Sequence, residues 1–481
     1  MTIIYNDWRD RSVAAMEYPD PMTKPDFSQS EKMHKEEPWP SPARAWYALG
    51  IFTTALVFNF IDRNILPLLV APIKDHLHLT DTQMSLLMGF AFICFYAIIG
   101  LPIARLADTM SRRLIFGIGI TLWSGMTAIC GLAQSFGQFF LFRMGVGIGE
   151  ACNGPATFSL LSDLFPPQKL PKALAILNLG YMFGTGIALL VGGTIIGVLA
   201  KMPGITLPVF GIIESWQMTF FAVGLPGLLI AALMRTIREP IRRGLLTTGG
   251  HQGTVAPAQT MPVMELIRFL YRHRRAYAPM YLALAIQSVM LTGVLSWLPA
   301  LFIRQHGWTV TQYGQIMGVI FLVIAPIGLL LGGFLAEWLA GKGYHDANMR
   351  MVTISAIAAL PFLVLAPLVA NPYLALVLLA GQNFALGLAI GPQNAAFQVI
   401  TPNQIRGQVT ALYLFIINIV GFGAGPTVIA LLTDYVFGNE EMVGYAMALE
   451  AGVMETLAVI VFWRGMKPYG ERYAELRAVG P

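Results

Sequence analysis

The chain has 481 residues, of which 56% are hydrophobic and only 12% charged, and its formal net charge is +5. Its mean hydropathy is +0.63, whereas soluble domains carry roughly 25% charged residues. A water-soluble fold is excluded because it could not bury so much apolar surface, and we predict a polytopic membrane protein instead.

The N-terminal segment, residues 1–41, is polar and rich in charge and proline. It lacks the apolar core of a cleavable signal peptide, so we expect a cytoplasmic arm. Met22 is as good a candidate for the natural start as Met1. The three cysteines lie inside apolar runs without CxxC spacing, which predicts neither disulfides nor a metal site.

Apolar runs long enough to cross the hydrocarbon core as helices follow this arm. We expect twelve of them, at 45–72, 82–106, 113–134, 137–163, 171–200, 214–236, 279–303, 312–339, 349–370, 372–399, 406–434 and 443–464. A longer polar connection separates the sixth from the seventh. The predicted fold is therefore an all-α membrane protein of two six-helix bundles, with the domain boundaries 42–236, linker 237–278, 279–466 and tail 467–481.

Lysine and arginine in the loops predict the orientation. The central connection from Arg235 to Arg275 holds eight arginines, and the loops on the same side carry further basic residues. The opposite loops are poorer, with Lys74, Lys201 and Arg304 as nearly their only basic residues. The positive-inside rule places both termini and the linker in the cytoplasm, so the positive charge does not indicate nucleic-acid binding.

The two halves share short motifs at corresponding places. The loop after the second span reads "ARLADTMSRR" (104–113), and the loop after the eighth reads "GFLAEWLAGK" (333–342). Each places Leu-Ala-acid before a base, and a Gly-Pro pair occurs in both the fourth and the tenth span. Together these matches predict an internal duplication.

This layout, over about residues 42–466, resembles the major facilitator superfamily of twelve-helix transporters. The family's loop motif, G-x-L-A-D-R-x-G-R-K, is matched at five positions, and the sequence departs from it at Ala104, Thr109 and Ser111. The resemblance implies a conformational latch at the cytoplasmic helix ends, for which the candidates are Asp108, Arg112, Arg113 and, in the second half, Glu337.

Within that superfamily, "FNFIDRNILPLL", "LTDTQMSLLMGFAF" and "RMGVGIGEACNGPA" resemble the spinster group. Animal members export sphingosine-1-phosphate or lysophospholipids, and bacterial homologues are proposed to be proton-driven. The resemblance implies a proton-coupled transporter for an amphipathic, lipid-like substrate, working by alternating access in a bacterial inner membrane. It also implies a monomer among membrane lipids, without a cofactor.

Proton coupling within the bilayer would depend on carboxylates, because all seven histidines fall in predicted loops or in the arm. Asp62 in the first span and Glu150 in the fourth lie roughly 15 and 18 Å below the outer surface, and Arg143 lies about 8 Å below it. Intramembrane charges are costly and mark transport pathways. We expect Arg143 to hold the deprotonated Asp62 and Glu150 in one proton-coupling cluster, the alternative being a structural role in helix docking.

Candidate substrate-binding residues come from both halves. The resemblance implies that helices 1, 4, 7 and 10 surround a central cavity, and from these helices we select Asn59, Arg63, Gln287, Trp297, Asn383 and Asn394. Tyr96 of the second span is selected as a wall that would suit an acyl chain. An anionic head group would lie near Arg143, which can bind phosphate or carboxylate bidentately. Arg63 points about 100° away from Asp62 around its helix and could instead bind a backbone carbonyl or a neighbouring helix.

Two other functions stay open at this point. The same scaffold could move small organic anions or drugs. A membrane-embedded enzyme is the alternative of another class, but the chain has no HExxH, no GxSxG and no phosphate-cradling loop, so we predict that it is not an enzyme.

Overall fold

A computed structural model describes residues 39–207, 211–242, 262–402 and 405–478. The predicted N-terminal arm therefore lies almost entirely outside the described residues. In the described part, eleven helices are long and apolar enough to cross a membrane. The long helices of the first half are α2 (Pro42–Leu68), α5 (Ala91–Thr109), α6 (Arg112–Cys130), α7 (Phe136–Glu150), α8 (Asn153–Leu164), α9 (Leu170–Leu199) and α10 (Ser215–Met234).

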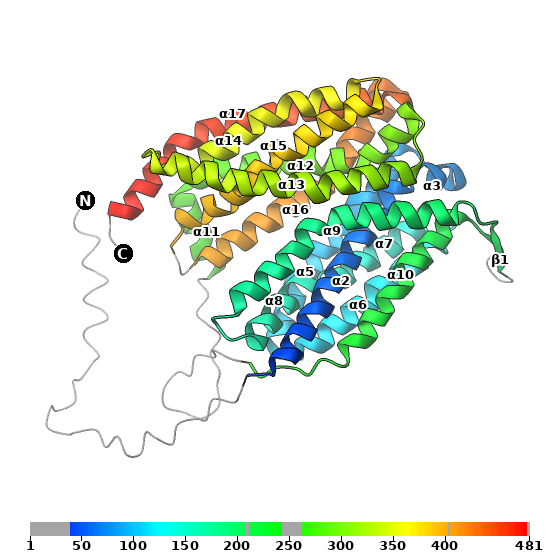
Figure 1. Cartoon of the computed structure of the whole chain (residues 1–481), viewed down its shortest axis with the longest axis horizontal. Coiled ribbons are helices and arrows are strands. Elements are labelled where there is room, and N and C mark those ends of the chain that lie inside the picture. The colour runs from blue at the N-terminus through cyan, green and yellow to red at the C-terminus, as the bar shows by residue number, and fades with distance from the viewer. Residues whose placement is uncertain (1–38, 208–210, 243–261, 403–404, 479–481) are drawn as a thin grey trace, which may run out of the picture. The chain divides into compact units, whose positions relative to one another are not determined.

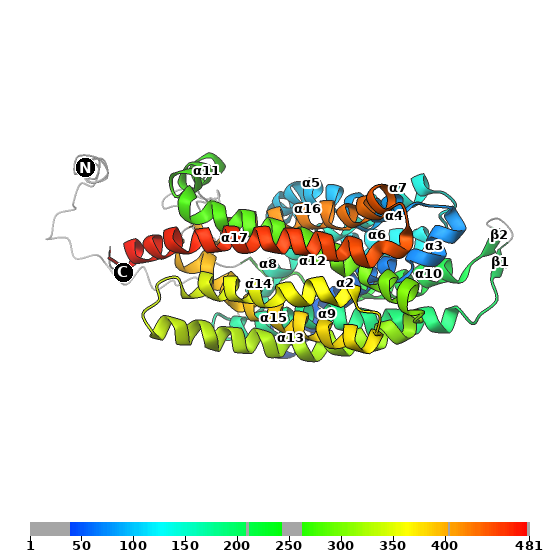
Figure 2. The same ribbon diagram turned by 90° about the horizontal axis from the view of Figure 1, so that it is seen from above.

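The second half contains six long helices (Figures 1 and 2). They are α12 (Arg274–His306), α13 (Val310–Gly341), α14 (Ala347–Leu365), α15 (Pro372–Val399), α16 (Arg406–Leu431) and α17 (Val443–Ala478). The short elements are α3 (Val70–Leu77), α4 (Asp81–Ser85), η1 (Leu86–Phe90), β1 (Ile205–Leu207), β2 (Gly211–Ile213), α11 (Val263–Arg272), η2 (Ala366–Leu368), η4 (Leu432–Phe437) and η5 (Glu440–Met442). The predicted linker thus contains a helix, α11, that we did not expect.

The fourth predicted span, 137–163, is not one helix. It consists of α7 and α8, which are separated at Ala151 and Cys152, directly after Glu150. Neither piece is long enough to cross alone, which explains why eleven helices and not twelve pass as spans. A proline at position 155 lacks the N–H that a continuous helix would donate to the carbonyl of Ala151. The break therefore lies beside a buried carboxylate.

The second span also departs from a regular helix. It runs through α4, the π-helical turn η1 and α5. Gly89 of this turn lies directly against the backbone of Phe422 in α16. A side chain there would clash with that backbone, so the glycine allows the two halves to approach at the π turn.

The two bundles meet along two seams, α9 with α13 and the second span with α16. Polar contacts between them gather at the end that carries Asp81, here called the Asp81 end. Thr311 donates to the carbonyl of Gly193 over 2.9 Å, and the Thr82 N–H donates to Asp434 over 2.7 Å. At the other end, the Arg112 end, the ribbons of α9 and α13 diverge (Figure 1).

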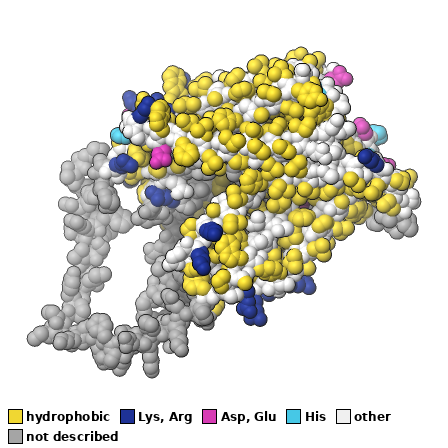
Figure 3. All heavy atoms as spheres, in the orientation of Figure 1, with side chains coloured by type: hydrophobic (Ala, Val, Ile, Leu, Met, Phe, Trp, Pro, Cys, Tyr) yellow, Lys and Arg dark blue, Asp and Glu magenta, His cyan; other side chains and the backbone are white. Residues whose placement is uncertain are grey.

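Apolar side chains cover the outer face of the bundles, and charged ones gather near the ends (Figure 3). Leu229, Phe334 and Trp463 are 69, 67 and 68% exposed. So many exposed apolar side chains would be unstable in water but match a lipid environment. The chain is therefore a multi-pass integral membrane protein.

Candidate functional site

A cavity of about 260 Å³ lies between the two bundles. Helices α2, α5, α7 and α9 and the turn η1 line it from the first half, and α12 and α16 from the second. Its lining residues are Phe60, Arg63, Asn64, Pro67, Met88, Phe92, Arg143, Thr185, Ser288, Leu291, Thr292, Leu295, Ser296, Ile417, Asn418 and Phe422. The two arginines come from the first half, and the second half adds neutral polar and apolar groups.

Arg63 forms the ion pair of this site. Its Nε and Nη2 both lie 2.7 Å from one oxygen of Glu150, Oε2. The Glu150 side chain is fully buried, whereas 21% of the Arg63 side chain is exposed. The other oxygen, Oε1, has no described hydrogen-bond partner. Arg63 therefore links a buried carboxylate to the cavity.

Asp62, the preceding residue, is also buried, with 3% of its surface exposed. Thr127 of α6 donates a hydrogen bond from its hydroxyl to Oδ2 of Asp62. Its Oδ1 and the side-chain amide nitrogen of the neighbouring Asn59 have no partner among the described residues. Asp62 is thus held within the first bundle and forms no salt bridge with a described cation.

Arg143 forms no salt bridge with Asp62 or Glu150 among the described residues, although we expected it to hold both carboxylates. It is buried, lines the cavity, and has no ion pair among the described residues. Its Nε and Nη1 have no described partner, and its guanidinium carbon lies 5.8 Å from the centre of the Phe92 ring. The long side chain of Arg63 reaches α7 and takes the position that we expected for Arg143.

Aromatic rings surround the Arg63 guanidinium. Its carbon lies 4.7 Å from the centre of the Phe92 ring, 5.4 Å from Tyr96 and 5.9 Å from Phe422. Phe92 and Tyr96 stack on each other at 5.5 Å. Rings at these distances attract the cation and fix its orientation. Tyr96, a predicted binding residue, therefore lies beside the site without lining the cavity.

The predicted binding residues of the second half are not in the cavity lining. The Gln287 side chain donates to Glu455 over 2.9 Å, and the Trp297 indole donates to the carbonyl of Pro426 over 2.8 Å. Asn383 and Asn394 donate to carbonyls of their own helix. Helix α15 supplies no residue to the cavity lining, and α16 takes its place.

Our selection also missed polar lining residues. Asn64, Ser288 and Ser296 lie directly beside positions that we chose, whereas Asn418 lies on α16, from which we chose none. Serine and asparagine are common in membrane helices, where they often bond their own backbone. The residue type alone therefore could not predict that these side chains line a cavity.

Of the predicted latch, Arg112 is buried and lies in an ion-pair network of the first half. It pairs with Asp163 of α8 and, through Nε at 3.1 Å, with Glu239 beyond the end of α10. Arg113 donates to the carbonyl of Ile237 over 3.0 Å. The network connects α6 to α8 and to the segment after α10, and we predicted neither acidic partner as part of it.

The other two latch candidates do not join this network in the described residues. Glu337 is exposed and has no described ion pair. The side chain of Asp108 lies outside what the structure describes. Glu239 is the acidic centre instead: burial opposes its ionisation, but hydrogen bonds from the Arg113 N–H, Ser111 and Arg112 hold the pKa of its carboxyl below the ordinary value.

A second ion-pair network, which we did not predict, lies at the Asp81 end. Asp81 is fully buried and accepts from Lys74 of α3 and from both Nη atoms of Arg304 in α12. Glu440 also contacts both cations. In the sequence, Lys74 and Arg304 are visible only as sparse loop charges. Arg304 and Asp81 are 223 positions apart, and no local pattern relates residues at that separation.

The arrangement combines a closed end, a central cavity with two arginines, and two buried carboxylates behind it. An anionic group entering the cavity would meet the Arg63 guanidinium, which Glu150 already engages. Substrate and carboxylate can therefore compete for one cation. A buried carboxylate that has lost its cation is then more easily protonated.

Comparison with known proteins agrees with this fold. Residues 51–459 match the Major Facilitator Superfamily. An "MFS-type efflux pump" of Mycolicibacterium smegmatis is 28% identical over 89% of this chain and 94% of its own length. A "Probable L-galactonate transporter" of Escherichia coli is 25% identical over 64% of this chain and 65% of its own.

Among solved structures, a bacterial homologue of the human lysosomal transporter Spinster, in an inward-facing and unoccupied conformation, has a TM-score of 0.74. It is 25% identical and is matched over 90% of this chain and 98% of its own. The resemblance to the spinster group is thus confirmed, and the match points to a transporter and not to an enzyme. The chain belongs to the Major Facilitator Superfamily, as a spinster-like transporter.

Proposed function

We propose that the chain is a proton-coupled transporter for amphipathic substrates with an anionic head group, of the lysophospholipid or sphingoid phosphate type. The observation that carries this proposal is the pairing of Arg63 with Glu150 at the cavity wall, 2.7 Å apart. The guanidinium has five donors, and Glu150 uses two of them. The remaining donors can bind a phosphate or carboxylate.

Proton coupling follows from this competition. When an anionic head group draws Arg63 away, Glu150 loses its cation in a buried site and takes up a proton. Asp62, which is also buried and has no salt bridge to a described residue, is the second acceptor. Release of the head group returns Arg63 to Glu150 and frees the proton, so the head group and the proton bind together and leave together.

The lipid-like tail has a candidate location beside the cavity. An apolar pocket of about 690 Å³ lies between η1–α5 and α16, lined by Phe90, Ile93, Cys94, Ala97, Ile98, Phe415, Ile419, Val420, Gly423 and Ala424. Phe92 and Phe422 of the same helices line the central cavity. A molecule with its head at Arg63 and its tail between these helices would be in contact with both regions.

The positive-inside rule supports an orientation for this cycle. It places the Arg112 end, the linker and both termini in the cytoplasm of a bacterial inner membrane. The closed Asp81 end then faces outward, and the structure corresponds to an inward-facing state. A second candidate substrate is a small sugar acid, which the relative described as a probable L-galactonate transporter favours.

The test is proton flux in proteoliposomes, with a lysophospholipid, sphingosine phosphate or L-galactonate as substrate. We expect a lipid to drive proton movement in the wild type, and Asp62→Asn and Glu150→Gln to abolish it. Glu265→Gln, which removes an exposed carboxylate on α11, is the matched control. Coupling that survives both buried substitutions would contradict the proton mechanism.

A further substitution distinguishes the two substrates. Gly423→Leu fills the apolar pocket, where an added Cβ meets only Ile93 at an ordinary contact distance of 3.7 Å. We expect loss of lipid-driven flux with retention of any galactonate-driven flux. If galactonate alone drives protons in the wild type, the lipid assignment is wrong and the sugar acid takes its place.

A further inference from the structure

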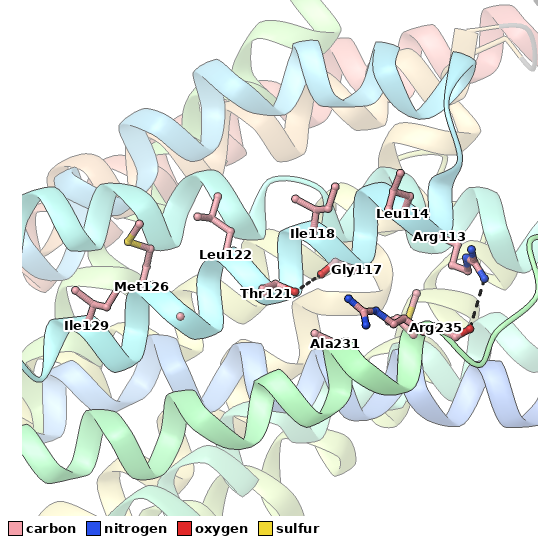
Figure 4. A pocket seen from close by; sticks show the side chains of 12 residues that line it. Arg113, Leu114, Gly117, Ile118, Thr121, Leu122, Met126, Ile129, Ala231 and Arg235 are labelled. Carbon is pink, nitrogen blue, oxygen red and sulfur yellow. Dashed lines mark hydrogen bonds between the residues drawn. The ribbon is translucent and has the colours of Figure 1, made fainter.

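A groove on the outer face of the first bundle lies between α6 and α10, away from the central cavity. Its volume is about 570 Å³, and its lining is mostly apolar: Leu114, Gly117, Ile118, Thr121, Leu122, Gly125, Met126, Ile129, Ala231 and Met234, with Arg113 and Arg235 at one end. Figure 4 shows the side chains of α6 in a row along that helix, with Ala231 and Arg235 on the neighbouring helix.

The groove follows the helix axis. From Arg113 to Ile129, α6 rises about 24 Å. One leaflet of a hydrocarbon core is about 15 Å deep. Gly117, Thr121 and Gly125 recur every four residues and therefore share one face of α6. An acyl chain that enters from the Arg113 end can lie along this face for the depth of its leaflet.

Neither arginine at the basic end of the groove forms an ion pair within the described part of the chain. The Arg235 side chain forms no hydrogen bond or ion pair with a described residue, and its guanidinium turns back along the groove toward Thr121 (Figure 4). Arg113 uses its guanidinium to bind the carbonyl of Ile237 at 3.0 Å and that of Arg235 at 3.5 Å. Arg113 and Arg235 thus place two cations at the headgroup level, at one end of the apolar groove.

The nearby acidic group, Glu239, forms no described ion pair with Arg113 or Arg235. Its Oε1 accepts from Arg112 at 3.1 Å, and its Oε2 accepts from the Ser111 hydroxyl at 2.8 Å and the Arg113 N–H at 2.9 Å. The carboxylate is therefore already occupied by groups at the start of α6. Its partner Arg112 is buried and does not line the groove.

We propose that this groove is a binding site for an anionic phospholipid of the cytoplasmic leaflet, with its phosphate at Arg113 and Arg235 and one acyl chain along α6. The leaflet assignment rests on the orientation proposed above, whereas the site itself does not. Because Arg113 also binds the end of α10, the lipid would connect α6 and α10 beside the Arg112 network.

The test measures which lipid stays on the protein. The chain is reconstituted in nanodiscs of equimolar phosphatidylglycerol and phosphatidylcholine, and retained lipid is identified by native mass spectrometry. We expect the wild type to retain phosphatidylglycerol in excess. Arg235→Gln should lower this excess about fivefold, the effect of one basic residue near a membrane surface. Arg268→Gln, an exposed arginine of α11, is the matched charge control.

A second variant tests the apolar part of the site without touching an arginine. A Cβ added at Gly125 meets no atom within 4 Å, so Gly125→Leu fills the groove without a clash. We expect it to remove the retained lipid, whereas Gly50→Leu, at an equally open glycine of α2, should not. The proposal would be overturned if Gly125→Leu retained as much lipid as the wild type. It would also be overturned if Arg268→Gln lost as much phosphatidylglycerol as Arg235→Gln.

This assay needs neither substrate nor a proton gradient. A failure of proton coupling would therefore leave the lipid result unaffected, and the reverse also holds.

Discussion

Arg304 and Asp81 form a bidentate ion pair that joins the two bundles. Nη1 of Arg304 lies 2.8 Å from Oδ2 of Asp81, and Nη2 lies 2.8 Å from Oδ1. Arg304 belongs to α12 and Asp81 to α4, and Lys74 of α3 binds the same carboxylate. A buried acid held by cations of both halves stabilises the closed Asp81 end.

Breaking this pair should open the Asp81 end. Asp81→Asn leaves Arg304 and Lys74 without their buried acid, and loss of one partner of a buried pair costs about 3–5 kcal/mol. We expect a shift of the conformational equilibrium toward separation of the halves. The measurement is the distance distribution between spin labels at positions 201 and 373.

The control for that experiment is Asp346→Asn. Its partner Arg350 lies four residues away in the first turn of α14, so the pair does not connect the halves. Such a helix pair contributes about 0.3–0.5 kcal/mol. A shorter or unchanged distance in Asp81→Asn would contradict the role of the interbundle pair.

The seam between α9 and α13 should depend on glycine. A Cβ at Gly193 would lie 3.1 Å from the Cα of Gly314 and 3.1 Å from the carbonyl oxygen of Val310. Because backbone cannot move away as a flexible side chain does, Gly193→Leu should push the two helices apart. We expect a lower thermal stability and a longer distance between the same two labels.

Gly333→Leu is the matched substitution on α13. An added Cβ at this glycine meets nothing within 4 Å. It should leave both readouts at the wild-type value, and an equal effect of the two variants would show that the seam is not the cause.

Arg63 should not tolerate lysine. Arg63→Lys keeps the charge but loses the two-donor contact to Glu150 and the contact with Phe92 at 4.7 Å. Because a hydrogen bond to a charged group contributes about 1.5–3 kcal/mol, we expect substrate-driven proton flux to fall about tenfold or more.

Arg143→Lys is the comparison for this prediction. Arg143 lines the same cavity without an ion pair to a described residue, and we expect a smaller loss. Both fluxes are measured with a pH-sensitive dye inside proteoliposomes. A larger loss in Arg143→Lys would reverse the roles assigned to the two arginines.

The Arg112 network should lose stability in acid. The pKa of Glu239 is lowered on folding, so its ionised form contributes stability fully above the ordinary value of 4.5. This contribution is lost as the pH falls through the lower folded pKa. We expect Glu239→Gln to melt below the wild type at pH 7, with a difference that shrinks below pH 4.5.

The melting temperature in detergent, followed across this pH range, checks the sign. A difference between wild type and Glu239→Gln that is constant with pH would show that the glutamine changes packing and not the charge network.

The sequence by itself predicted the membrane class, the two bundles and the presence of charge at the centre. Apolar runs and loop arginines are properties of the chain that do not depend on how helices pack. Asp62 and Glu150 could be selected for the same reason, because a carboxylate within an apolar run has few explanations. Their burial in the structure agrees with that expectation.

Only the tertiary structure decided which groups meet. Helical rise gives only an expected depth for Arg143 and Glu150. Which cation pairs with Glu150 depends on the direction and reach of side chains across helices, and Arg63 makes this pair. The cavity lining by α16 and the pair of Asp81 with Arg304 likewise depend on how two bundles dock. Contacts between residues more than two hundred positions apart leave no local pattern in a single sequence, because each residue satisfies its own helix equally well without the partner.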